Sequence, residues 1–205
     1  MSGIVGSKFN HRGSGLVASY GTDGQHMLSA GAGVSNVFET VAAASGGLDV
    51  SDVWRVHTGA TVDSTAPELT SNWERADDVG QGSLGTGMTE SSGVFTFPAT
   101  GFWTVNWGFH LSHGGGTQSR YAGGRGYISP DSGSTYTQVL EAGGSIVSNY
   151  STTWAQNFQG FAQFDVTDAS TFRMKFGIYA ESSGDFWANT QKNSNFVHFS
   201  KVGAT

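Results

Sequence analysis

The chain has 205 residues, among them 31 glycines, 3 prolines and no cysteine, and its formal net charge is −6 at pH 7. This length suffices for one domain with a proper hydrophobic core and an appendage. The negative charge argues against nucleic acid as a partner, and the lack of cysteine excludes disulfides, thiolate chemistry and cysteine-ligated metals.

No stretch of the sequence is apolar for long enough to be a signal peptide or a membrane span. We therefore expect a protein that is made and folded in the cytoplasm and that does not insert into a membrane. If it acts outside a cell, something other than a classical secretion signal must take it there.

Residues 1–47 differ from the rest of the chain, because they hold Gly, Ser, Ala and Val in short polar–apolar alternations. Residues 21–33 predict a turn, a short strand and a second turn, with Asp23-Gly24 and two later glycines at the positive-φ positions. A segment this thin cannot bury enough surface to fold alone. We expect a partner to hold it, and residues 42–47, AAASGG, to act as a joint.

Residues 48–70 are interpreted as a linker or as the first strand of the domain that follows. Residues 52–62 predict a strand, with Val53 or Trp54 as its anchor. The main domain is expected to span residues 71–205.

Residues 77–93 predict an exposed loop, rich in Gly and Ser. The loop carries carboxylates at Asp77, Asp78 and Glu90, the kind of ligand that Ca²⁺ prefers. Their spacing matches no calcium-binding loop, and a solvated acidic loop is the commoner arrangement.

The strongest pattern lies in residues 93–111. From Trp103 onward every second residue is large and apolar, which predicts a strand with one deeply buried face. The residues expected to form this core and trimer scaffold, together with two aromatics upstream, are Phe95, Phe97, Trp103, Val105, Trp107 and Phe109. We expect residues 94–97 and 102–111 to pair as a hairpin across the turn that begins at Pro98.

Further strands follow at a spacing of roughly ten residues. Residues 114–126 predict a glycine-rich loop, and 126–129 with 136–140 predict a hairpin around the turn Pro130–Gly133. The remaining predicted strands are 157–166, 171–179 and 196–202. Eight or more short strands without a credible helix are typical of a β-sandwich or jelly roll.

The strand 171–179 has two distinct faces. Phe172, Met174, Phe176 and Ile178 point one way, whereas Arg173, Lys175 and Tyr179 point the other way. The first set is therefore expected in the core.

Residues 71–205 resemble the globular head of complement recognition proteins and tumour necrosis factor. The resemblance lies in Gly93, Phe95, Phe97, Gly101, Trp103 and Val105 and in the final strand Asn195–Gly203. It implies an all-β, ten-stranded jelly roll that packs as a homotrimer, and a head that binds ligands on its outer loops. A jelly roll with this many aromatics would expose sizeable apolar patches as a monomer, and contact between copies would cover them.

Residues 21–33, followed by Phe38-Glu39, resemble a unit found in bacteriophage tail fibres and related virion proteins: Gly21-Thr-Asp-Gly-Gln25-x-x-Leu28-Ser-x-Gly31-Ala-Gly33. The chain has no collagen stalk, cysteines or signal peptide, which fits a secreted eukaryotic head poorly. It fits a protein that is assembled onto a virion in the host cytoplasm, where lysis brings it outside.

The sequence shows no catalytic, metal or cofactor site, so we expect a protein that is not an enzyme. His110 and His113 are three residues apart on a strand and point to opposite faces, which does not suit a shared metal. No serine lies in a nucleophile motif. A depolymerase would need paired carboxylates, for which the candidates are Asp165 with Asp168 and Glu181 with Asp185.

Exposed aromatic residues are the better indication of binding, because Tyr and Trp rings stack on sugars and anchor interfaces. The candidate binding residues, which we place in the loops of the head, are Arg120, Tyr121, Arg125, Tyr150, Trp154 and Trp187. A host surface glycan is the expected ligand.

We therefore expect a bacteriophage virion structural protein, a short homotrimeric tail fibre or spike. The residues expected to attach it to a tail or capsid protein are Lys8, Phe9, Arg12, Gln25 and Leu28. The alternatives are a capsid decoration protein and a carbohydrate-binding adhesion module.

Overall fold

The computed structural model divides the chain into two units, Met1–Gly46 and Gly47–Thr205. The structure describes residues 25–28, 37–39, 48–62, 64–65, 68–113, 120–145, 154–182, 184–186, 188 and 190–205. In the first unit, strand β1 (His26–Leu28) pairs antiparallel with β2 (Val37–Glu39). The attachment candidates Lys8, Phe9 and Arg12 lie outside the described residues. Of the other two, Leu28 is exposed and Gln25 is half-buried.

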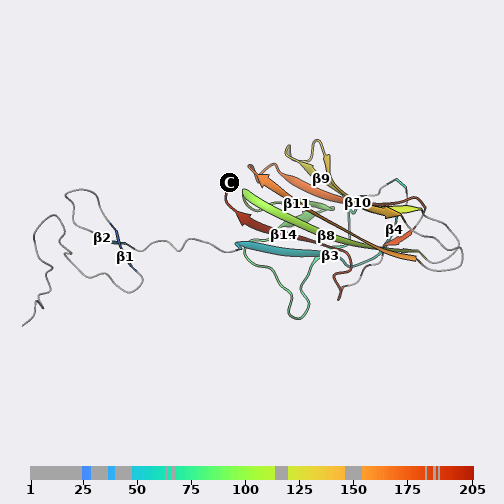
Figure 1. Ribbon diagram of the computed structural model, residues 1–205, viewed down its shortest axis with the longest axis horizontal. Coiled ribbons are helices and arrows are strands. Elements are labelled where there is room, and N and C mark those ends of the chain that lie inside the picture. Colours follow the sequence, from blue (N-terminus) through green and yellow to red (C-terminus); the bar gives the residue numbers. More distant parts are fainter. Residues whose placement is uncertain are drawn as a thin grey trace, which may run out of the picture. The chain divides into compact units, whose positions relative to one another are not determined.

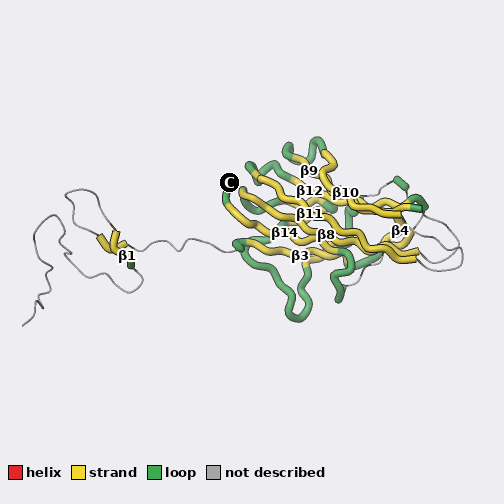
Figure 2. Tube along the Cα trace, in the orientation of Figure 1, coloured by secondary structure: helices red, strands yellow, loops and turns green. Residues whose placement is uncertain are grey.

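The second unit consists of two antiparallel sheets (Figure 1). The strands of the five-stranded sheet, in the order β10-β9-β12-β7-β6, are β10 (Thr137–Ser145), β9 (Tyr121–Ser129), β12 (Arg173–Ala180), β7 (Val94–Thr96) and β6 (Thr89–Ser91). The described part of the chain contains strands, turns and loops and no helix (Figure 2). It accordingly contains no helix that could span a membrane.

In the seven-stranded sheet, the strands β4-β13-β8-β14-β3-β5 pair with their neighbours in this order, and β11 pairs with β8 as well. Its strands are β4 (Ala60–Val62), β13 (Gly184–Phe186), β8 (Gly101–His113), β14 (Phe196–Gly203), β3 (Val50–Val56), β5 (Trp73–Arg75) and β11 (Trp154–Val166). Because β3 lies inside this sheet, the segment 48–70 contributes a strand to the sandwich. The predicted all-β jelly-roll sandwich is confirmed.

The core lies between the two sheets and is largely aromatic. Trp103, Trp107 and Phe109 on β8 are at most 1% exposed, as their alternation predicted. From the opposite sheet, Met174, Phe176 and Ile178 on β12 are fully buried. Ring pairs such as Phe97–Trp103, whose centroids are 5.2 Å apart in an edge-to-face arrangement, join the two layers.

The predicted hairpin between residues 94–97 and 102–111 is wrong. Strand β7 pairs with β6 and β12, whereas β8 pairs with β11, β13 and β14, so the two strands lie in opposite sheets. The segment from Phe97 to Gly101 crosses between the layers instead of reversing within one. Alternation shows which face of a strand is buried, and the apolar faces of β7 and β8 do pack against each other. It does not show which sheet holds each strand.

The predicted glycine-rich loop is also wrong in its second half, because residues 121–126 belong to β9. A Cβ at Gly124 would lie 2.6 Å from Trp107 Cζ3, and one at Gly123 would lie 2.6 Å from Tyr179 Oη. The two glycines therefore make room for a ring on each face of the strand. Glycine here serves packing and not a turn.

The second predicted hairpin is confirmed, since β9 pairs with β10 across the turn at Pro130–Gly133. Ser132 and Gly133 have φ values of 62° and 89°, as a tight turn of this kind requires. Asp131 holds the turn: it accepts hydrogen bonds from Ser129 Oγ at 2.6 Å and from Thr135 N at 3.0 Å.

Candidate binding surfaces

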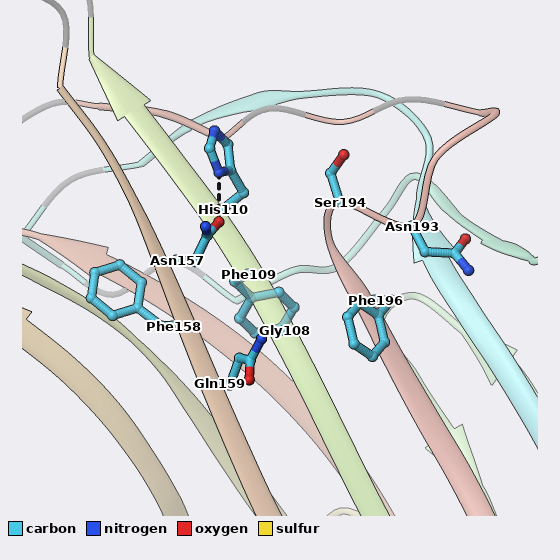
Figure 3. A pocket seen from close by; sticks show the side chains of 9 residues that line it. All are labelled: Gly108, Phe109, His110, Asn157, Phe158, Gln159, Asn193, Ser194 and Phe196. Atoms are coloured by element: carbon cyan, nitrogen blue, oxygen red, sulfur yellow. Dashed lines mark hydrogen bonds between the residues drawn. The ribbon is translucent and has the colours of Figure 1, made fainter.

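The outer surface of the seven-stranded sheet carries a groove of about 320 Å³ where β8, β11 and β14 lie side by side (Figure 3). A second hollow of the same size adjoins it and shares Gln159 and Phe196. We name this surface the amide face and define it by its outward side chains: Asn106, His110, Asn157, Gln159, Phe161 and Phe196.

The shape of the amide face depends on the register of β14 with β8 and on Gly108 of β8. Phe196 of β14 lies opposite Gly108 of β8, and a Cβ at Gly108 would be 2.7 Å from the Phe196 ring. The Phe196 ring therefore lies over Gly108, and a larger residue at position 108 would have to displace it. On the other side of β8, His110 Nδ1 and Asn157 Oδ1 are 2.7 Å apart (Figure 3). Because a carbonyl oxygen only accepts, His110 Nδ1 is the donor in this contact.

The amide face combines an exposed ring with an uncharged lining. The described residues that line the two hollows carry amide, hydroxyl, imidazole or aromatic groups, and none carries a carboxylate, ammonium or guanidinium group. Phe161, on β11, is 59% exposed. Phe161 and Phe196 line the same hollow, and exposed apolar groups that gather in one place mark surfaces that meet another molecule.

The outer surface of the five-stranded sheet is different in chemistry. On β9 the outward positions alternate with buried Ala122, Gly124 and Gly126. We name this surface the tyrosine face and define it by Tyr121, Arg125, Tyr127, Tyr136, Lys175 and Tyr179.

Tyr179 is the centre of the tyrosine face. It is directed over Gly123 and Gly143, which lie opposite each other on β9 and β10. Its hydroxyl donates to Glu141 Oε1 at 2.9 Å, and the Arg125 guanidinium lies 4.2 Å from its ring centroid. Burial and the Glu141 carboxylate raise the pKa of Tyr179, while the hydrogen bond from Tyr179 lowers the pKa of Glu141. The guanidinium thus lies over a ring whose hydroxyl is hydrogen-bonded to Glu141.

Two further cations, Lys175 and Arg120, are also paired with carboxylates. Lys175 Nζ lies 3.8 Å from the Tyr136 ring centroid and forms an ion pair with Glu68. Arg120 donates to Glu181 through its backbone N and through Nε, each at 2.6 Å. This double contact raises the pKa of Arg120 and lowers the pKa of Glu181. Rings, cations and carboxylates therefore recur along β9 and β12.

The tyrosine face contains two of the predicted binding residues, Tyr121 and Arg125, and a third, Arg120, directly precedes β9 at its edge. Trp154 begins β11 in the other sheet, and its side chain lies outside the described part, as do Tyr150 and Trp187. Sequence reasoning missed Tyr179 and Lys175 as members of this site. It placed them on the outward side of their strand, but nothing in the sequence showed that β12 lies beside β9.

The acidic segment near residue 77 forms ion pairs with Arg55. Arg55 on β3 is 2% exposed; its Nε donates to Glu74 at 2.7 Å, and its Nη2 donates to Asp77 at 3.1 Å. Asp78 and Gln81 approach Nη1. The predicted exposed loop is open at residues 79–86, but residues 89–91 form β6 and Met88 is buried.

Of the other carboxylates considered for chemistry, Asp168 and Glu181 are held by local hydrogen bonds. Asp168 accepts from Ser170 N at 2.9 Å and from Ser170 Oγ at 2.6 Å, which lowers the pKa of Asp168. Glu181 is held by Arg120 as described above. Among the described side chains no group of three His, Asp or Glu residues could hold a metal ion.

Comparisons with known proteins concern the fold alone. No family model matches the sequence, and no curated protein matches it. Among solved structures, the Eiger TNF of S. frugiperda matches with a TM-score of 0.55 and 12% sequence identity, covering 76% of this chain and 93% of that one. Murine APRIL at pH 5.0 matches with a TM-score of 0.51 and 10% identity, covering 74% and 98%. The sandwich is therefore a TNF-like jelly roll.

Proposed function

We propose that the chain is a non-enzymatic structural protein of a bacteriophage virion, a short homotrimeric tail fibre or spike. Residues 1–47 anchor it to the particle, and the sandwich forms a head that contacts the host surface. The fibre-type unit at Gly21–Gly33 supports the first part, and the TNF-like fold with its amide face supports the second.

The amide face is the observation that supports a trimer. The chain has a net charge of −6, and a contact between copies through an uncharged surface adds no repulsion between like charges. The amide face is such a surface, and it exposes Phe161 beside a hollow that can accept a ring. In a ring of three copies, Phe161 of each copy would enter the hollow on the amide face of the next, with a rotation of 120° between neighbours.

Trimer formation through the amide face leaves the tyrosine face on the outside of the head. Tyrosine and arginine are enriched at binding hot spots. This face is therefore the surface that meets the host.

Reloading of particles that lack the protein tests the attachment. The full chain should bind to such particles, whereas a chain without residues 1–47 should fold and not bind. If the truncated chain attaches as well as the full chain, the anchoring role of the first segment is wrong.

A capsid decoration protein would show the same attachment and the same trimer, but no contact with the host. The free head distinguishes the two: added to cells before infection, it should block adsorption if the protein is a fibre or spike. Failure to block would favour decoration. A head that binds glycans and is absent from particles would favour the adhesion module, for which the tyrosine face is the relevant observation.

A further inference from the structure

The tyrosine face repeats one arrangement along two neighbouring strands. Outward positions are two residues apart, or about 7 Å, and on β12 they include Lys175, Tyr179 and, just beyond the strand, Glu181. On β9 they include Tyr121 and Arg125. The result is a row of rings with a paired cation and carboxylate beside each.

The charges of the tyrosine face are balanced. Its three cation–carboxylate pairs are Arg120 with Glu181, Arg125 with Glu141 and Lys175 with Glu68. Arg173, the next cation along β12, donates to backbone carbonyls of Ala169, Ser170 and Phe172. The acidic surplus of the chain lies instead in residues 48–92.

A balanced face of this kind favours a ligand with hydroxyl groups over a polyanion. A hydroxyl donates to a carboxylate and accepts from a guanidinium, so each pair can bind the neighbouring hydroxyls of one sugar. A polyanion, in contrast, would gain little from cations whose charge is already neutralised by carboxylates.

Side chains of the face also contact one another in the absence of a ligand. Arg125 lies on the Tyr179 ring, and Gln138 and Tyr179 both donate to Glu141. Tyr121 lies 6.2 Å from Tyr179, between ring centroids, and is 44% exposed. Groups that are fixed in advance lose little conformational entropy on binding.

We propose that the tyrosine face binds a neutral polysaccharide. The ring of Tyr121 packs against the C–H face of one sugar, and the Arg120–Glu181 and Arg125–Glu141 pairs bind hydroxyls of that sugar and its neighbour. The proposal rests on the proposed function, in which the head faces a host surface, and it names the ligand class and the sheet that takes it.

Binding of the full chain to immobilised dextran, mannan and galactan tests the proposal, with alginate and teichoic acid as anionic probes. At least one neutral probe should bind, and its affinity should be constant between about 0.05 and about 0.5 M salt. Tyr121→Ala should weaken binding about tenfold, and Tyr121→Phe should restore it, because the ring is retained. Lys192→Ala, an exposed change away from this face, should bind as the parent does.

Three outcomes overturn the proposal: no neutral probe binds, only anionic probes bind and salt abolishes their binding, or Tyr121→Ala binds like the parent while its thermal unfolding is unchanged. These outcomes are distinct from failure of the proposed function. A trimer on the particle that binds no neutral polysaccharide overturns this inference alone, and a monomer that binds one overturns the trimer alone.

Discussion

At the scale of single residues, the fold depends on rings fitted against glycines. Trp107 on β8 packs against Gly160 of the neighbouring strand and against Gly124 of the opposite sheet. Its ring centroid lies 4.8 Å from that of Phe109. The alternation in the sequence correctly predicted that Trp107 is buried, but the glycines that admit it come from distant segments. No local pattern could pair them, because their role depends on the register of three strands.

Replacing Gly124 with alanine should therefore destabilise the protein. The added methyl would lie 2.6 Å from Trp107 Cζ3 and 2.7 Å from Phe109 Cδ2. Overpacking of this kind costs about 1–3 kcal/mol of the free energy of unfolding, which urea unfolding measures. Gly82→Ala is the control, because nothing lies within 4 Å of its Cβ. Equal urea midpoints for the two variants would contradict this account of the core.

At the scale of elements, the β9–β10 hairpin should weaken in acid. Hydrogen bonds from Ser129 and Thr135 lower the pKa of Asp131 from 3.8 to about 2. A carboxyl whose pKa is lower in the folded than in the unfolded protein stabilises the folded state above its unfolded pKa. That contribution is lost as the pH falls through the folded value.

Asp131→Asn should accordingly be less stable than the parent at neutral pH, because Thr135 Oγ1 loses the acceptor Oδ2. The difference in free energy of unfolding should shrink between about pH 4 and about pH 2. Urea unfolding of both proteins across this range checks the prediction. A difference that does not change with pH would exclude the carboxylate as its cause.

Arg55 holds the start of the acidic loop, whereas hydrogen bonds of Leu84 and Met88 hold its far end. The Arg55 guanidinium connects Glu74 on β5 with Asp77, Asp78 and Gln81 in the loop. Arg55→Ala should release the loop, so that thermolysin cleaves before Val79, which is fully exposed, roughly five to ten times faster. Lys192→Ala should be cut at the parent's rate. If Arg55→Ala is cut no faster at this site, the arginine does not hold the loop.

At the scale of the whole molecule, the sequence predicted the layers better than their connections. Alternating residues gave the buried faces of β8 and β12, and turn residues gave the β9–β10 hairpin. The pairing of β7 away from β8 was missed, since a strand's own residues do not show which sheet it joins. The tyrosine face was only half predicted for the same reason: Arg125 and Tyr179 become neighbours through the register of β9 with β12.

A charge placed in the amide face should prevent the contact between copies of the chain. Phe161→Asp would bury an unpaired carboxylate in each contact between copies, at a cost of several kcal/mol. The variant should therefore be a monomer with an unchanged circular dichroism spectrum. Val139→Asp, an exposed apolar position on the other sheet, should leave the assembly intact.

Sedimentation velocity of the intact chain at micromolar concentration distinguishes a trimer from a monomer. We expect a single species with three times the mass of one chain, and we expect Phe161→Asp to sediment with the mass of one chain. A parent protein that sediments as a monomer would contradict the trimer, and with it the head proposed for the virion.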